Sequence, residues 1–434
     1  MTKTEQTLHI DEYGYPVRPD SRRILRNLVV RGSRRLLLAA IYLFMQTIGS
    51  WLQFSRRQQH FSPIDAQSFR PCRILVIRVD LIGDLVLSLT TVRALKRTYP
   101  EAEIDLLATP ASGRVIVDDP DLAEVITYDP NIWRRPKALL QQKNWREAFS
   151  LRRRLRARHY DLALSVSGPW AAIIAVLSGA KRTIGFAQEG YPGLLTDPVP
   201  GRHWAPDDHK HEVDYCLELL QAAGVIPTPA DRIPHLTAPS TAVDEVEHLL
   251  QNLELRADKP LIACHVSANN GQSKRWPIPY WAILLDQLIA EDGANVILTG
   301  APNDLPLIEQ ITQRMHQQAL NLAGKTSLSQ LAALLQRTDL LLTGDSGPMH
   351  IAAAVGTPLI AIHGPTDPAL SGPISPKATV LRSDIWCSPC YTAQGPADCR
   401  FHTTQCMKNI TPAQVYATIQ EKLHVPTTQA EATS

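Results

Sequence analysis

The sequence predicts an α/β protein with two Rossmann-like domains and an N-terminal helical extension. Short apolar runs of strand length alternate with helical patterns along most of the chain, which is the order of parallel βαβ units. A proline-rich segment at residues 227–239 interrupts this alternation. The length of 434 residues also exceeds what one compact core usually holds. We therefore place the domains at residues 72–226 and 240–410, after an extension at 1–71 and before a last helix at 411–425.

The extension predicts contact with a membrane. Residues 36–54 carry no charged side chain and would form a helix about 28 Å long, close to the thickness of a bilayer core. On a helical wheel, however, polar side chains such as Gln46 and Gln53 fall in one stripe, which favours an amphipathic helix that lies in the interface. A spanning helix and a helix packed on the protein's own core are the alternatives. We expect peripheral association with the inner, cytoplasmic face of the cell membrane.

The charge composition argues against a nucleic-acid partner. Lys and Arg together number 44 and Asp and Glu 42, which gives a net charge of +2, whereas nucleic-acid binders are usually strongly basic. Arginines nevertheless crowd the N-terminal extension, which fits an anionic surface. A second basic run, from Arg152 to Arg158, usually marks a solvated helix face, and contact with an anionic acceptor or membrane is the alternative.

The first domain opens with a βαβ unit that places an acidic residue at the end of a strand. Residues 73–79 form an apolar run of strand length, 80–84 a loop, 85–99 a helical pattern and 104–108 a second strand. Ligands of such folds bind outside the carboxyl ends of the strands, which is where Asp84 lies. This loop alone favours a simpler interpretation, in which Asp84 is a helix N-terminal acid that complements the helix dipole.

The second domain repeats the pattern, with three loops that each follow a strand. Because the carboxyl ends of parallel strands share one edge of a sheet, we expect these loops to converge. The predicted strands are residues 261–266, 295–299 and 339–343, and the loops are 267–277, 300–304 and 344–350.

The third loop predicts an anion-binding site. Its sequence, GDSGPMH, joins a strand to a helix through small residues, and free backbone N–H groups at a helix N-terminus bind phosphate. Lys274 from the first loop adds a positive charge suited to a diphosphate. Taken singly, these features are explained equally well by a helix N-cap and a surface lysine. The expected backbone donors are Ser346, Gly347, Met349 and His350.

With these motifs in order, the sequence resembles glycosyltransferase family 9, the heptosyltransferases of lipopolysaccharide core synthesis. The resemblance covers roughly residues 72–425 and rests on ILVIRVDLIGD at 74–84, KRWP at 274–277, GDSGPMH at 344–350 and HGPTD at 363–367. It implies a GT-B fold, in which two domains face each other across a cleft and the last helix returns toward the first domain. It also implies inversion at the anomeric carbon, no metal requirement and usually an ADP-activated heptose donor.

Carried over by motif, the resemblance implies a role for each candidate residue. Asp84 would be the general base that takes the proton of the acceptor hydroxyl. Lys274 and the amides of residues 346–350 would hold the diphosphate and stabilise the leaving group, and Asp345 would hold hydroxyls of the donor sugar. The remaining donor-site candidates are Ser267, Asn269 and Asp304, the last of which would face the nucleoside.

The leading hypothesis is therefore an inverting glycosyltransferase that acts on a nucleotide-sugar donor and a glycolipid or glycan acceptor. A nucleotide-sugar epimerase of similar architecture is an alternative, but it would need further acid–base carboxylates that the sequence does not reveal. A non-catalytic, membrane-bound scaffold is a third hypothesis. Such a scaffold would have no use for Asp84, Lys274 and Asp345 together.

A cysteine cluster lies near the C-terminus, before the last helix. Its spacing is compatible with a tetrahedral zinc site, and disulfides or free thiols are the alternatives. Because the implied mechanism requires no cofactor, a zinc ion here would be structural and would brace the end of the chain. The cluster consists of Cys387, Cys390, Cys399 and Cys406.

Overall fold

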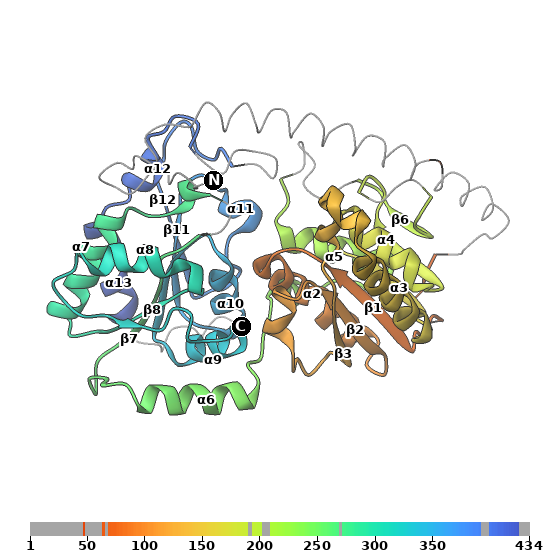
Figure 1. Ribbon diagram of the computed structural model, residues 1–434, viewed down its shortest axis with the longest axis horizontal. Helices are drawn as coiled ribbons and strands as arrows, with labels where there is room; N and C mark the ends of the chain where they lie inside the picture. Colours follow the sequence, from red (N-terminus) through yellow and green to blue (C-terminus); the bar gives the residue numbers. More distant parts are fainter. Residues whose placement is uncertain are drawn as a thin grey trace. The chain divides into compact units, whose positions relative to one another are not determined.

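A computed structural model describes Thr47 and residues 63–65, 68–189, 193–201, 209–268, 271–391 and 399–424. The chain divides into two compact units, whose described residues fall within Ser21–Pro239 and Ser240–Ser434. We call them the N-terminal unit and the C-terminal unit. Each consists of a sheet with helices packed on it (Figure 1).

The N-terminal unit contains a six-stranded parallel sheet with the order β3-β2-β1-β4-β5-β6. The inner strands β1 and β4 are almost entirely buried, which explains their nearly unbroken apolar sequence. The strands are β1 (Arg73–Arg78), β2 (Glu103–Ala108), β3 (Glu124–Thr127), β4 (Leu162–Ser165), β5 (Arg182–Phe186) and β6 (Asp197–Val199).

Helices follow the strands of this unit along the chain. Apolar side chains from the sheet and from α4, among them Ile77, Leu107 and Ile174, form a buried core between them. Helix α5 packs beside α2. The helices are α2 (Ile82–Thr98), α3 (Gln142–Ala157), α4 (Gly168–Ser178) and α5 (Glu212–Ala222).

The C-terminal unit contains a second six-stranded parallel sheet, with the order β12-β11-β10-β7-β8-β9. Its four inner strands are buried along their whole length. The strands are β7 (Leu261–His265), β8 (Asn295–Thr299), β9 (Leu320–Asn321), β10 (Leu340–Gly344), β11 (Leu359–His363) and β12 (Ala378–Arg382). The helices are α6 (Ser240–Gln251), α7 (Ile278–Ala290), α8 (Leu305–Thr312), α9 (Leu328–Arg337), α10 (Gly347–Val355), α11 (Pro368–Ser371), α12 (Gln405–Lys408) and α13 (Pro412–His424).

The last helix packs into the core of the C-terminal unit. α13 lies against α7, and its Val415 and Ile419 side chains are fully buried. Just before this helix, the Ile410 carbonyl accepts a hydrogen bond from Trp276 Nε1 at 2.8 Å. The expected return of this helix toward the first domain stays a prediction.

The five strands predicted above lie within one residue of β1, β2, β7, β8 and β10, but two helices start earlier than the sequence predicts. α2 begins at Ile82 instead of residue 85, and α10 begins at Gly347 instead of residue 351. The first turn of α2 contains Gly83 and that of α10 contains Pro348, and a helix interior disfavours both residue types. The first turn tolerates them because its N–H groups lack intrahelical partners. Asp84 therefore lies within the first turn of a helix and not in the preceding loop.

The predicted membrane helix, residues 36–54, lies outside the described residues except for Thr47. Among the residues that the structure describes, no helix is both long and apolar enough to cross a bilayer. The choice between an interfacial, a spanning and a self-packed helix stays open.

Candidate functional site

The strand-end loops of the C-terminal unit bring together two of the predicted binding residues. Strands β10, β7 and β8 are neighbours in the parallel sheet, so their carboxyl ends share one edge. Lys274, after β7, meets Asp345, after β10, with Nζ 2.7 Å from Oδ2, and neither side chain is more than 12% exposed. The loops therefore converge, as the sequence predicts.

The Asp345 carboxylate of this pair is buried but remains ionised. Burial is the largest single influence and would raise the pKa of Asp345, but Lys274, His363 and His350 together lower that pKa below its ordinary value. Gly344 permits this approach, because a Cβ there would lie only 3.3 Å from the Lys274 carbonyl oxygen. An ammonium group has three N–H donors, so its bond to Asp345 leaves capacity for an anion.

The N-terminus of α10 lies directly after this pair. Ser346 is the N-cap residue, but its hydroxyl contacts Thr343 Oγ1 at 2.9 Å and does not cap the helix. The sequence predicts that the Met349 N–H is a free donor for a phosphate, and this prediction is wrong. The N–H donates to the Ser346 carbonyl at 3.2 Å, because the helix starts earlier than expected. Gly347 opens the helix, where the positive end of its dipole lies, and the His350 side chain is buried in its first turns.

Ser267 and Asp304 form a second polar contact at the same edge of the sheet. Ser267 Oγ donates to Asp304 Oδ1 at 2.6 Å, and Asp304 Oδ2 accepts from the Ala301 N–H at 2.7 Å. Burial lowers the pKa of the neighbouring His265 to about 4, so this imidazole is neutral at pH 7. Asn269 lies outside the described residues, and its role stays a prediction.

Tyr391 contacts the ion pair, although no sequence motif marks it. Lys274 Nζ lies 4.3 Å from the centroid of the Tyr391 ring, within the range of a cation–π interaction. The backbone N–H groups of Cys390 and Tyr391 both donate to the Pro365 carbonyl, at 2.9 and 2.8 Å. The loop after β11 thus holds Tyr391 in place.

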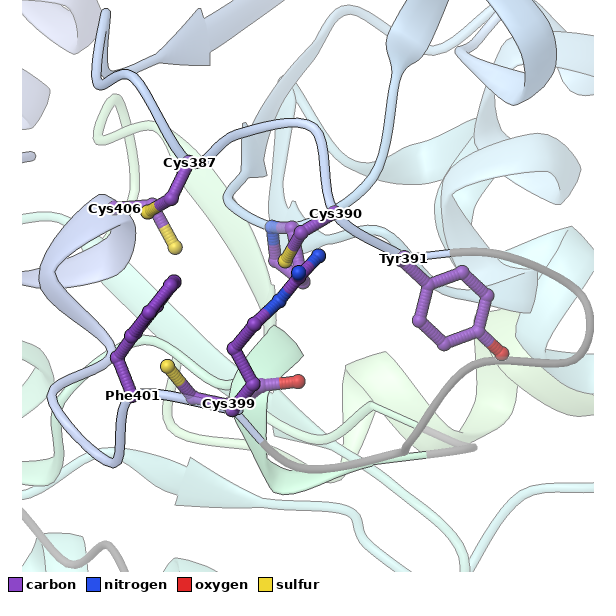
Figure 2. Close-up of a pocket in the computed structure, with 9 residues that line it drawn as sticks. Cys387, Cys390, Tyr391, Cys399, Phe401 and Cys406 are labelled. Atoms are coloured by element: carbon purple, nitrogen blue, oxygen red, sulfur yellow. The ribbon is translucent and has the colours of Figure 1, made fainter.

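The four C-terminal cysteines line one pocket, together with Tyr391 and Phe401 (Figure 2). All four are free thiols. In the described part of the chain, no group of three or more His, Cys, Asp or Glu side chains has an arrangement that would hold a metal ion. A structural zinc at Cys387, Cys390, Cys399 and Cys406 therefore stays a prediction.

Asp84 lies in the N-terminal unit, in the first turn of α2. Its side chain is 35% exposed, and Oδ1 lies 3.9 Å from Nη2 of Arg78, which is buried. The same guanidinium lies 3.1 Å from Asp80 Oδ2 and 2.8 Å from Glu212 Oε1. Partial exposure leaves the Asp84 carboxylate accessible to a substrate, while the helix-dipole interpretation accounts equally well for its position.

Sequence reasoning missed Arg78 and Glu212. Burial alone would lower the pKa of Arg78, but Glu212, Asp80 and Asp84 raise it well above its ordinary value, so the guanidinium stays charged. A charged residue inside an apolar strand would have identified Arg78, because buried charges need partners. No comparable feature of the sequence identifies Glu212, because it lies in the first turn of α5, far along the chain from Arg78.

Comparison with known proteins places the chain among sugar-transferring enzymes. The model of glycosyltransferase family 9 (heptosyltransferase) matches residues 148–400, which include the strand-end loops of the C-terminal unit but begin after Asp84. Lipopolysaccharide heptosyltransferase 2 of Salmonella typhimurium is 32% identical over 317 residues, which are 71% of this chain and 88% of that protein. The family resemblance seen in the sequence is thereby confirmed.

Two solved structures share the architecture. A family 9 glycosyl transferase from Veillonella parvula has a TM-score of 0.69 at 21% identity and covers 84% of this chain and 99% of its own. The ADP-heptose lps heptosyltransferase II of E. coli has a TM-score of 0.63 at 27% identity and covers 81% of this chain and 98% of its own. These similarities identify the two-sheet architecture as the GT-B fold and confirm the predicted fold class.

Proposed function

This chain belongs to glycosyltransferase family 9 and is a glycosyltransferase, and we propose that it transfers a heptose from an ADP-activated donor to a lipopolysaccharide-type acceptor. The names of its relatives support this choice, since one names lipopolysaccharide and the other names ADP-heptose and lps. Family membership leaves no reason to retain the epimerase or the scaffold. Because such an acceptor is a glycolipid, we place the enzyme at the cytoplasmic face of a membrane.

The Lys274–Asp345 pair at the start of α10 is the observation that carries the proposal. A departing nucleoside diphosphate needs positive charge, and Lys274 together with the N-terminus of α10 supplies it. Asp345 holds Lys274 in position and offers its second carboxylate oxygen to hydroxyls of the donor sugar. The Ser267–Asp304 contact lies on the same edge of the sheet, which suits the nucleoside.

Asp84 is the proposed general base. Its carboxylate takes the proton of the acceptor hydroxyl while that oxygen forms a bond to the anomeric carbon and the bond from this carbon to the diphosphate breaks. A single displacement of this kind inverts the anomeric configuration. The accessible position of Asp84 at the carboxyl end of β1 supports the role, although the family model begins after this residue.

We expect turnover to be independent of added divalent ions, because Lys274 and the helix N-terminus supply the charge that a metal would otherwise provide. The test is the transfer rate in the presence of EDTA. A rate that EDTA abolishes and magnesium restores would contradict this part of the mechanism.

The central test replaces Asp84 with Asn. Turnover with ADP-heptose and a lipopolysaccharide precursor should fall by about 10² to 10⁴, because the variant lacks the base, while calorimetry should find ADP affinity unchanged. Asp80→Asn is the matched control, since Asp80 pairs with the same arginine and has similar exposure. Near-normal turnover in Asp84→Asn, or an equal loss in Asp80→Asn, would contradict the assignment.

A further inference from the structure

The N-terminal unit exposes an apolar patch at the start of α3. Four large hydrophobic side chains between residues 139 and 149 are exposed: Leu139 (48%), Leu140 (88%), Trp145 (43%) and Phe149 (63%). Single exposed hydrophobic residues are common on soluble proteins, whereas a contiguous group usually marks a contact surface. We call these four residues the α3 patch.

Specific contacts hold the α3 patch in its outward position. The short helix η3 (Pro136–Leu140) is tied to α3 by a hydrogen bond of 2.9 Å from Trp145 Nε1 to the Leu139 carbonyl. The Trp145 ring lies 4.8 Å from the ring of Trp133 and 6.2 Å from that of Phe149, between centroids. The aromatic side chains therefore form one ordered row.

The core of the unit does not use this row. Helix α3 buries Asn144 and Leu155 and packs Leu151 against the core, which are positions spaced for one face of a helix. Trp145 and Phe149 are four residues apart and share a different face. The helix thus has one apolar surface for its own sheet and a second one that remains exposed.

Positive charge surrounds the α3 patch. Between residues 130 and 158 the sequence has ten Lys and Arg residues and a single acidic one, Glu147. Two of the arginines serve the fold, since Arg154 pairs with Glu124 and Arg158 lies 2.9 Å from Asp105. The exposed basic residues around the patch include Arg134, Arg135, Lys137, Arg146, Arg153 and Arg156.

We propose that the α3 patch docks the enzyme on an anionic bilayer surface. Interfacial helices combine exposed aromatic and aliphatic side chains, which enter the boundary of the acyl chains, with Arg and Lys, which bind anionic headgroups. The α3 patch and its basic border have both components. The α3 patch consists of other residues than the predicted membrane helix at 36–54, and the inference does not depend on the sugar donor or the acceptor.

The first test measures binding of the full-length protein to phosphatidylcholine vesicles with and without phosphatidylglycerol. Binding should require the anionic lipid and weaken at high salt. The variant Trp145→Ala/Phe149→Ala should bind at least about tenfold more weakly, because two large apolar side chains no longer leave water. Leu177→Ala is the matched control, since Leu177 is 41% exposed in the same unit but outside the patch. Equal affinity of the double variant and the wild type would overturn the proposal.

The second test separates this surface from other membrane-binding segments. Lipids brominated on their acyl chains should quench the fluorescence of Trp145 in vesicle-bound protein, and this component should disappear in Trp145→Phe, which keeps the apolar contact. Equal quenching of the bound wild type and the bound variant would show that Trp145 stays in water and would overturn the proposal. Neither readout involves sugar transfer, so a failure of the proposed activity would leave both results interpretable.

Discussion

Lys274 forms an ion pair with Asp345, and this pairing determines what either side chain contributes to binding and to stability. Both groups are largely buried, so the protein has already removed them from water. A buried ion pair adds little net stability, but the loss of one partner is costly because the other charge remains buried. Substitutions at these positions therefore affect folding as well as binding, and an experiment must separate the two.

A double variant makes this separation. Lys274→Met should lower the free energy of unfolding by about 3 to 5 kcal/mol, because it leaves the Asp345 carboxylate buried without a counterion. Lys274→Met/Asp345→Asn should recover most of that loss, as measured by urea unfolding. Both variants should lose about 1.5 to 3 kcal/mol of ADP affinity by calorimetry, the usual value of a hydrogen bond to a charged group.

The two measurements have independent outcomes. If the double variant binds ADP like the wild type, Lys274 does not hold the diphosphate. If the single and double variants are equally unstable, the unpaired Asp345 carboxylate does not cause the loss of stability in Lys274→Met. In the wild type the pKa of Asp345 lies below its ordinary value, so the comparison is best made near neutral pH, where this carboxylate is ionised.

The loop that carries Tyr391 is held by its neighbours along the chain and in space. Ser388 Oγ donates to the Gly364 carbonyl at 2.6 Å, next to the Pro365 carbonyl that anchors Tyr391. Gly364 is required for this packing, because a Cβ there would clash with Met407 of α12. The loop that lines the cysteine pocket thus also positions Tyr391, whose ring lies over Lys274.

The thiols of this pocket should differ in reactivity. Burial raises the pKa of Cys406 to about 11. Burial also opposes ionisation of Cys399, but backbone N–H groups of Thr404, Thr403 and Phe401 stabilise its thiolate and lower its pKa below the ordinary value. In the reduced, metal-free protein, Cys399 should therefore react with iodoacetamide at a lower pH than Cys406.

Mass spectrometry of peptides alkylated across a pH series measures this order. Elemental analysis of the untreated protein addresses the metal: about one zinc per chain, with all four thiols protected until a chelator is added, would establish the structural site. Alkylation of Cys406 before Cys399 would contradict the predicted order, and disulfide-linked peptides would exclude a tetrathiolate.

The two units each have their own sheet and buried core, so each is expected to unfold as a cooperative body. Calorimetry should resolve two transitions. Leu107→Ala in β2 and Leu342→Ala in β10 are matched probes, since both side chains are fully buried in a parallel strand, and each should destabilise its own unit by about 2 to 5 kcal/mol.

ADP should raise the unfolding temperature of only one transition, the one whose temperature Leu342→Ala lowers, because the proposed diphosphate ligands lie in the C-terminal unit. At a concentration about 100 times its Kd, a ligand that binds the native state stabilises it by about 2.7 kcal/mol. A single transition that moves with both variants would show that the units unfold together. If ADP instead raises the temperature of the transition that Leu107→Ala lowers, ADP binds to the N-terminal unit.

The sequence by itself determined the βαβ order, the loops that carry Lys274, Asp304 and Asp345, and the family. The order and the loops follow because buried parallel strands appear as apolar runs and turns appear as Gly and Pro, whereas the family follows from the resemblance of four motifs. Only the tertiary structure decided which side chains meet. Arg78 and Glu212 are 134 positions apart and Lys274 and Asp345 are 71 apart, and local periodicity carries no information about such pairs. The exposure of the α3 patch likewise depends on which helix face the sheet covers.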